Sequence, residues 1–417
     1  MSQSKYYIQQ SKHFLLLAIS FFIPFYKKIV PPLIILWFLL TLFELSFENF
    51  KQSRHKPLFY SITSYFILLV ISLLWTENMN TGIKELEAKL SLIVFPIAFA
   101  FSPSLSLKKQ INTIKAFILG NITTIITQLA IATFRFLTQK DELIQKISFF
   151  FTYVEFSYFI HPSYASMFSL FSIISILYLI YVHKESKKWL FLILILFPSI
   201  YLYSSKAGFI VAFISILILI LFYIIKYKKL IPSIISFILF LLLGIFLYKS
   251  PRVQSLIKER KINIAKSKNS EKTDTRIILW QLNVELIQQN LILGTGVGDY
   301  KDEMVKIYKK IRYQKAIEKM LDSHNQFLKS FAVIGIFGFA NMLLIFIIAF
   351  YNSIRERNLY TFLFAMILFL NFLVESMLIR QTGVVFFGFF FSALFFLHHP
   401  QNDENIETSL QSSSNKK

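Results

Sequence analysis

The chain has 417 residues, of which 55% are hydrophobic and 48 are phenylalanine, and its formal net charge is +21. A mean hydropathy of +0.57 excludes an ordinary soluble domain and indicates a polytopic membrane protein. The absence of cysteine excludes disulfides and thiolate metal sites. In such a protein, the excess of Lys and Arg is typical of short loops that face an anionic membrane surface rather than of nucleic-acid binding.

Apolar runs separated by short polar loops predict an all-α polytopic membrane protein with about 12 transmembrane helices. The runs are residues 14–26, 30–47, 58–75, 90–101, 111–137, 163–181, 189–203, 209–225, 231–248, 324–350, 360–379 and 384–397. Residues 76–89 are acidic and amphipathic, so we expect them to lie along the membrane interface. The predicted domains are a membrane domain over residues 1–248, a large hydrophilic loop with amphipathic helices over residues 249–323, a second membrane domain over residues 324–399 and a disordered tail over residues 400–417.

The distribution of basic residues predicts the orientation of these helices. Short loops that fall on one side carry most of the Lys and Arg: Lys51, Arg54, Lys56, Lys108, Lys109, Lys184, Lys187, Lys188, Lys226, Lys228, Lys229, Arg355 and Arg357. The positive-inside rule places these loops, both termini and the tail in the cytoplasm. The large loop then lies on the outer side, together with Lys206, His324 and Arg380.

The stretch Asp322-Ser323-His324-Asn325-Gln326 directly precedes the tenth apolar run. Ser323 and Gln326 have the spacing of a capping box, which predicts a helix that carries His324 on its first turn, at the membrane surface. The unpaired amides of that turn disfavour imidazolium, so we expect a neutral His324 whose pKa lies below the usual value. A surface histidine that only caps a membrane helix is the alternative. Gly335 and Gly338 return to the same helix face, where another helix can pack closely.

The large loop contains Arg276 at a predicted helix N-terminus, and Trp280 follows one turn later on the same face. Leu279, Leu282 and Leu286 give this helix an apolar side that we expect to lie on the bilayer. An amphipathic surface helix with an ordinary arginine explains the same pattern. Residues 294–299 are glycine-rich but lack the Gly-Lys-[Ser/Thr] ending of a phosphate-binding loop, so a flexible turn is the preferred interpretation.

Four other positions are candidates for a site. Lys206 follows two serines at a helix start, which suits phosphate binding, although an interfacial lysine would look the same. Glu375, in the eleventh run, is interpreted as the structural partner of an Arg or Lys in preference to a catalytic role. His161 and Tyr164 begin the sixth run and can either line a pocket or anchor the helix at the interface.

The pattern His-Asn-x(9)-Gly-x-x-Gly, formed by His324, Asn325, Gly335 and Gly338, resembles the signature of the bacterial O-antigen ligase family. Arg276 with Trp280 upstream of this motif resembles the family's loop arginine. Lys206 stands where the family usually has arginine, and lysine lacks the bidentate fork for phosphate. Looser forms of the motif occur in O-antigen polymerases and protein O-oligosaccharyltransferases.

The resemblance implies a metal-independent inverting glycosyltransferase without cofactor or ATP, which works at the periplasmic face of the bacterial inner membrane. Its donor would be a glycan on undecaprenyl diphosphate and its acceptor a sugar hydroxyl of lipid A-core. His324 would be the general base, and Arg276, Lys206 and Arg380 would hold the diphosphate. Asn325, Trp280, Gly335, Gly338, His161 and Tyr164 would support this site.

Two other functions remain open from the sequence. A polysaccharide polymerase would use a second lipid-linked glycan as its acceptor. A transporter for lipid-linked glycan would explain a basic outer cavity but not the His-Asn motif, and no inverted repeat favours it.

Overall fold

The computed structural model describes residues 3–53, 55–138, 149–203, 205–227 and 275–396. All regular secondary structure in these residues is helical, as predicted, and no strand occurs within them. The helices of the first half are α1 (Gln3–Phe25), α2 (Val30–Leu42), α3 (Phe47–Gln52), α4 (Lys56–Ile71), α5 (Met79–Lys89), α6 (Ser91–Phe101), α7 (Leu107–Thr138) and α9 (Tyr153–Phe156). Those of the second half are α10 (Pro162–Tyr181), α11 (Ile193–Tyr203), α12 (Lys206–Tyr227), α15 (Thr275–Gln289), α16 (Tyr300–Lys310), α17 (Gln314–Lys319), α18 (Gln326–Arg355), α19 (Leu359–Val374) and α20 (Gln381–Phe396).

Within the described residues, four helical segments are long and apolar enough to cross a membrane: Lys56–Trp75, Leu107–Thr138, Pro162–Tyr181 and Gln326–Arg355. Four shorter apolar helices accompany them: Val30–Leu42, Gly208–Leu219, Leu359–Val374 and Gln381–Phe396. Every predicted apolar run falls on a described helix except the ninth, residues 231–248, which lies outside the described residues. The number of helices that cross the membrane therefore stays a prediction.

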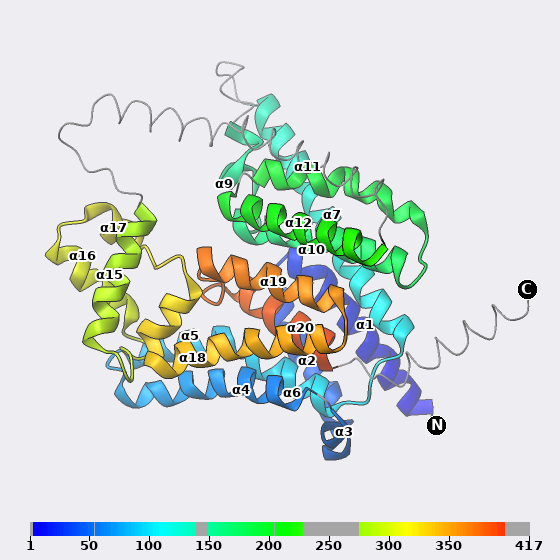
Figure 1. Cartoon of the computed structure of the whole chain (residues 1–417), viewed down its shortest axis with the longest axis horizontal. Coiled ribbons are helices and arrows are strands. Elements are labelled where there is room, and N and C mark those ends of the chain that lie inside the picture. The colour runs from blue at the N-terminus through cyan, green and yellow to red at the C-terminus, as the bar shows by residue number, and fades with distance from the viewer. Residues whose placement is uncertain (1–2, 54, 139–148, 204, 228–274, 397–417) are drawn as a thin grey trace, which may run out of the picture.

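Apolar side chains pack these helices into one body. Helix α18 lies between α4 and α19, α20 packs on α6, and α10, α11 and α12 form a neighbouring layer (Figure 1). Phenylalanine fills the space where α7, α10 and α20 meet: the ring of Phe117 lies 4.8 Å from that of Phe390, and Phe168 lies 4.6 Å from Phe386. At these centroid distances, the attraction between aromatic rings stabilises the packing in addition to the burial of their apolar surface.

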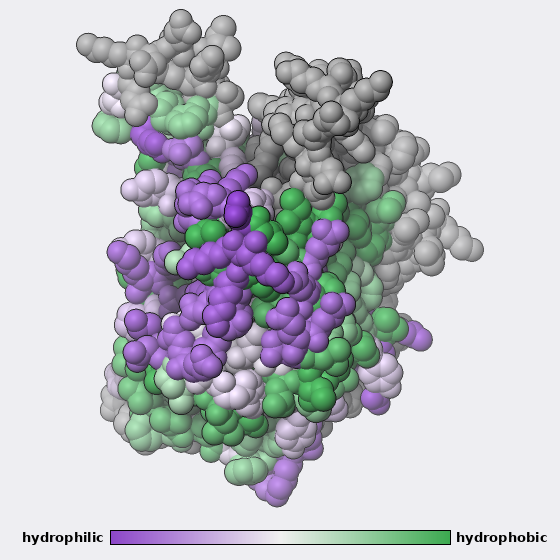
Figure 2. Space-filling model, turned by 90° about the vertical axis from the view of Figure 1, so that its left-hand side faces the viewer, coloured by the Kyte–Doolittle hydropathy of each residue, from purple (hydrophilic) through white to green (hydrophobic). Residues whose placement is uncertain are grey.

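One end of the molecule is polar. Helices α15, α16 and α17 gather at this end, beside the start of α18 (Figure 1). Hydrophilic side chains cover much of that end face, and apolar surface lies below and beside them (Figure 2). Helix α18 therefore begins at the polar end of the molecule, and its last residue, Arg355, lies at the other end of the helix.

The apolar side of α15 does not lie on an external surface, contrary to our prediction. Leu279 and Leu286 are fully buried and Leu282 is 8% exposed, because α15 packs against α16 and α18. Helical periodicity showed which face is apolar, but it could not show whether protein or lipid covers that face.

The glycine-rich turn is a packed connector rather than a flexible one. The amides of Thr295 and Gly296 donate to the carbonyls of Ala332 and Val333 in α18, both at 2.9 Å. The carboxylate of Asp299 accepts two hydrogen bonds of 2.7 Å from the backbone amides of residues 77 and 78. The turn therefore fixes α15 and α16 to α18 and to the start of α5.

Gly335 interrupts α18 where this connector lies, and it is not a helix-packing position as we predicted. Its φ of +62° belongs to the left-handed region, and a Cβ there would meet the carbonyl of Ile292. The amide of Ile336 donates to the carbonyl of Leu291 at 3.0 Å. Beside Gly338, the nearest atoms belong to Ile334 and Ser330 of the same helix. Gly335 thus admits a loop backbone instead of a neighbouring helix.

Candidate active site

His324 lies before α18 and not on its first turn, so the predicted capping box is wrong. Asn325 is the cap, and its Oδ1 accepts from the amide of Leu328 at 3.0 Å. His324 has a φ of +45°, a conformation that is uncommon for residues other than glycine and that places Ser323 outside the helix. The Asp322 carboxylate accepts a hydrogen bond from the amide of His324 at 2.8 Å and supports this conformation.

The turn that follows α19 holds the other side of this segment. Nδ2 of Asn325 donates to the carbonyl of Leu373 at 3.0 Å, and the amide of Leu378 donates to Oε1 of Gln326 at 2.8 Å. Ser376 Oγ accepts from the amide of Asn325 at 3.2 Å. These contacts fix the two turns against each other, so the residues that they carry keep a constant distance.

Glu375 is the partner of His324 across these turns. Its Oε1 lies 3.1 Å from Nδ1 of the histidine, and its Oε2 accepts from Ser163 Oγ at 3.3 Å. Glu375 is 7% exposed. The sequence interpretation gave it to an Arg or Lys, and the structure pairs it with the motif histidine instead. Because Nδ1 faces a carboxylate, the imidazole is set to carry a proton on Nδ1 and to present Nε2 as the acceptor.

The hydrogen bond to Glu375 raises the pKa of His324 above its usual 6.5, with further help from the charge of Asp322. Burial and the positive charge of Arg276 act in the opposite direction but do not outweigh these carboxylates. We predicted a lowered pKa, and that prediction is wrong for two reasons. His324 is not on the helix turn whose amides were to lower it, and the carboxylate from the turn after α19 could not be placed from sequence.

The imidazole faces a cavity of about 180 Å³ at the polar end of the molecule. This cavity unites residues from four separate stretches of the chain: His161, Tyr164, Tyr300, Lys301, Tyr308, Asp322, His324, Lys329, Glu375 and Arg380 are among those that line it. A polar cavity of this volume is large enough for several water molecules. Arg380, His161 and Tyr164, which we expected near His324 on resemblance and position, all lie in its wall.

Tyr164 and His161 belong to the start of α10. The hydroxyl of Tyr164 donates to the carbonyl of Met377 at 3.2 Å, so the tyrosine also holds the turn that carries Glu375. Burial lowers the pKa of His161; Glu375 opposes that shift and Arg380 adds to it. His161 is therefore a neutral wall residue beside the His324–Glu375 pair.

Arg276 is the second residue of α15, as predicted, and its charge acts on both His324 and Glu375. Trp280, one turn later, donates from its indole Nε1 to the carbonyl of Ser323 at 2.9 Å. The tryptophan thereby joins the arginine helix to the histidine segment. Helix α12 begins at Lys206, as predicted, but the side chain of Lys206 lies outside what the structure describes.

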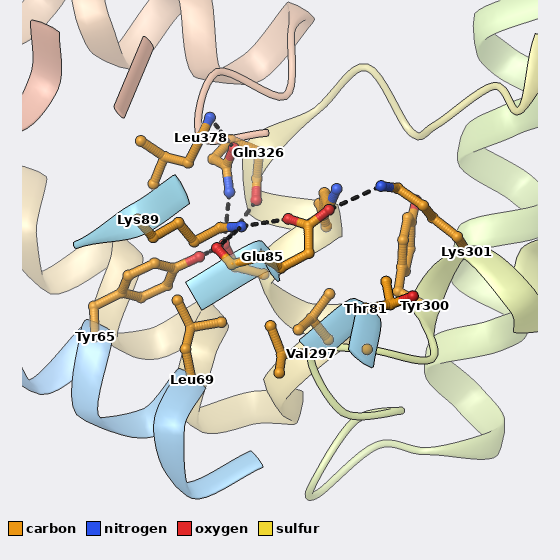
Figure 3. A pocket seen from close by; sticks show the side chains of 14 residues that line it. Tyr65, Leu69, Thr81, Glu85, Lys89, Val297, Tyr300, Lys301, Gln326 and Leu378 are labelled. Carbon is orange, nitrogen blue, oxygen red and sulfur yellow. Dashed lines mark hydrogen bonds and ion pairs between the residues drawn. The ribbon is translucent and has the colours of Figure 1, made fainter. Parts of the chain in front are cut away.

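Two cations in the cavity wall were missed by the sequence analysis. Lys329 lies in the first turn of α18, and Lys301 is the second residue of α16, just after the glycine-rich turn. Both also line a smaller neighbouring cavity of about 20 Å³, in which Glu85 and Lys89 of α5 and Tyr300 of α16 come together (Figure 3). A lysine inside an apolar run is itself a signal of function, and Lys329 could have been found on that ground.

This arrangement suits proton transfer beside an anion. A carboxylate-supported imidazole can accept a proton at Nε2, and the nearby cations can stabilise negative charge on a leaving group. Among the residues that the structure describes, no group of three His, Asp or Glu side chains is placed to hold a metal ion.

Comparison with curated proteins finds no match to the chain. A family model does match, over residues 189–343, and its description is O-Antigen ligase. The matched residues contain Lys206, Arg276, His324 and both motif glycines, whereas Glu375 and Arg380 lie beyond them. The match agrees with a membrane glycosyltransferase of the O-antigen ligase and polymerase kind. The match over these residues supports the O-antigen ligase family for this part of the chain.

Proposed function

We propose that the protein is an O-antigen ligase-like glycosyltransferase of the bacterial inner membrane. It moves a glycan from undecaprenyl diphosphate to a sugar hydroxyl of lipid A-core at the periplasmic face. The observation that carries this proposal is the His324–Glu375 pair, 3.1 Å apart, in a cavity whose wall also holds Arg380. The family match supplies the substrate class, which is a lipid-linked glycan.

In the proposed reaction, Nε2 of His324 takes the proton of the acceptor hydroxyl as its oxygen attacks the anomeric carbon. The bond between that carbon and the diphosphate oxygen breaks, and the diphosphate leaves with the electron pair. Attack from the opposite face inverts the anomeric centre. Arg276, Lys206 and Arg380 stabilise the charge that develops on the diphosphate.

Glu375 serves as a positioning residue for this base. Its carboxylate fixes the ring orientation and the tautomer, and it stabilises the imidazolium that forms during transfer. In this mechanism the basic side chains, and not a metal ion, neutralise the charge of the leaving group. ATP is not consumed, because the diphosphate linkage already activates the sugar.

The test measures glycan transfer by the purified protein in detergent or nanodiscs, with lipid-linked glycan as donor and lipid A-core as acceptor. The assay contains EDTA and no added metal ion or nucleotide. We expect glycosylated lipid A-core and free undecaprenyl diphosphate in equal amounts. Elongated lipid-linked glycan without lipid A-core modification would identify a polymerase instead. Activity that returns only when Mg²⁺ or Mn²⁺ is added would exclude the cation mechanism.

A further inference from the structure

Lys329 is a buried cation at the wall between two cavities. It lies five residues after His324, is 7% exposed, and lines both the cavity of His324 and the smaller one beside it. Its Nζ lies 4.9 Å from the centroid of the Tyr300 ring. The attraction between a cation and an aromatic face offsets only some of the cost of burying an ammonium group.

The charges that line the smaller cavity do not balance, whereas in the larger cavity the carboxylates of Asp322 and Glu375 lie with His324 and Arg380. The smaller cavity is lined by three lysines, Lys89, Lys301 and Lys329, and by one carboxylate, that of Glu85. Glu85 uses its two oxygens for Lys89 at 2.5 Å and Lys301 at 2.8 Å, and Figure 3 shows it between them. Within the stretches of chain that the structure describes, no hydrogen bond or ion pair reaches Nζ of Lys329.

A buried ammonium without a counter-ion is unfavourable in the protein alone. Because Lys329 borders the cavity that His324 faces, a ligand in that cavity can supply the missing negative charge. Lys301, with a side chain that is 46% exposed, lines the same wall and adds a second positive charge.

We propose that Lys329, assisted by Lys301, binds an oxyanion of the substrate beside His324. The oxyanion is either a phosphate of the lipid diphosphate or the carboxylate of an acidic sugar in the transferred glycan or its acceptor. The identity of the substrate rests on the proposed function, whereas the anion site itself rests on the burial and the charge imbalance. Lys329 and Lys301 lie on α18 and α16, whereas Arg276 lies on α15 and Arg380 in the turn before α20, so the four cations come from different elements.

The experiment measures anion binding to the purified protein, without transfer, by thermal shift and calorimetry. The probes are inorganic pyrophosphate and glucuronate. The variant is Lys329→Met, which keeps the length of the side chain and removes its charge. The matched control is Lys306→Gln on α16, where the lysine pairs with Glu303 at the surface and lines neither cavity.

We expect Lys329→Met to weaken binding of one probe at least tenfold, as for the loss of a charge-assisted contact, and Lys306→Gln to bind like the wild type. Loss for pyrophosphate identifies the diphosphate, and loss for glucuronate identifies an acidic sugar. Without ligand, the Tm of Lys329→Met should equal or exceed that of the wild type, because an uncompensated charge has been removed.

The proposal is overturned if the wild type binds neither probe, or if Lys329→Met binds both as the wild type does. A lowered Tm of Lys329→Met with unchanged anion binding would make Lys329 a structural residue. If the wild type binds pyrophosphate through Lys329 but transfers no glycan, the anion site stands and the proposed function fails.

Discussion

Glu375 Oε1 and His324 Nδ1 lie 3.1 Å apart and join the turn after α19 to the segment before α18. The two residues are 51 positions apart in the chain, and neither lies on a helix. Hydrogen bonds of Asn325, Gln326 and Ser376 hold their turns together. The imidazole is therefore oriented before any substrate arrives, which is the condition for efficient proton transfer.

The first prediction concerns the pH dependence of transfer. Because Glu375 raises the pKa of His324 above 6.5, wild-type turnover should fall as the pH drops through this raised pKa and the imidazole becomes protonated. Glu375→Gln should move this acidic limb to lower pH. It should also reduce the plateau rate by about tenfold to 10²-fold, the range for loss of a hydrogen bond to a charged group. The measurement is kcat from pH 5 to 9.

Glu303→Gln is the control for this change, because Glu303 is an acidic residue of α16 that pairs with Lys306 and does not line the His324 cavity. Its profile should match that of the wild type. An unchanged acidic limb in Glu375→Gln would mean that the carboxylate does not control the base.

The second prediction concerns the base itself. His324→Ala should lose about 10²–10⁴-fold in turnover, the usual contribution of a general base. Binding of the donor should persist, because the diphosphate contacts come from other residues. His324→Asn should show the same loss, and asparagine tolerates the positive φ at this position, so backbone strain is separated from chemistry. If either variant, at equal protein level, transfers glycan almost as fast as the wild type, His324 is not the general base and only precedes the helix.

How far the sequence predicts this site depends on the range of the contacts involved. Residues 322–326 and Gly335 could be recognised as a motif because their spacing is local. Arg276 could be placed at a helix start for the same reason. The partner of His324 could not be predicted, since Glu375 reaches it through the packing of α18 on α19. Nor could the cap be assigned correctly, because Ser323 and Asn325 are both good caps and only the positive φ of His324 selects the second.

The fold was predictable at the level of its helices, since apolar run length is a property of the sequence alone. The packing of α15 was not, because an apolar helix face looks the same whether lipid or protein covers it. The break at Gly335 was also hidden, because glycine in an apolar helix predicts close helix packing as readily as a left-handed turn.

The third prediction concerns the arginine of α15. Arg276→Ala should weaken donor binding by roughly 10–150-fold, which corresponds to a charge-assisted contact of about 1.5–3 kcal/mol. Turnover should fall as well, since the same charge would stabilise the leaving diphosphate. Lys309→Ala removes one exposed positive charge from α16 and should change neither value. If Arg276→Ala binds the donor as tightly as the wild type does, Arg276 does not bind the diphosphate.

Lys206 is tested in the same assay. Lys206→Arg should be tolerated, because the related family usually has arginine at the corresponding position. Lys206→Ala should weaken donor binding. Unchanged transfer by Lys206→Ala would make this lysine an interfacial anchor.

The fourth prediction concerns stability at the break in α18. An alanine at Gly335 would carry a Cβ within 1.9 Å of the carbonyl oxygen of Ile292, at a φ of +62°. The backbone conformation alone should cost about 1–3 kcal/mol, and displacement of the connector adds to it. We expect a lower Tm for Gly335→Ala in detergent, whereas Ile347→Ala, which changes a side chain 61% exposed on the same helix, should have a small effect. Equal Tm values for the two variants would show that the break is not required.

The fifth prediction concerns the orientation in the membrane, and α18 provides the geometry for it. Beyond the break at Gly335, residues 336–355 of this helix rise about 30 Å, enough to cross a hydrocarbon core of about 30 Å. His324 lies before its start, whereas at its end Oε1 of Glu356 lies 3.2 Å from Nε2 of His55, which is close in sequence to Lys51. The active site and Lys51 should therefore lie on opposite sides of the membrane, with Lys51 inside by the positive-inside rule.

Single cysteines test this orientation without background, because the chain has no cysteine of its own. Lys309→Cys on α16 and Lys51→Cys on α3 both replace exposed lysines. A membrane-impermeant maleimide should label Lys309→Cys in intact spheroplasts and Lys51→Cys only after lysis. Labelling in the reverse order would place the His324 cavity in the cytoplasm. His324 could then not act on a periplasmic acceptor. That result would exclude the proposed reaction, even if every substitution at the site reduced glycan transfer.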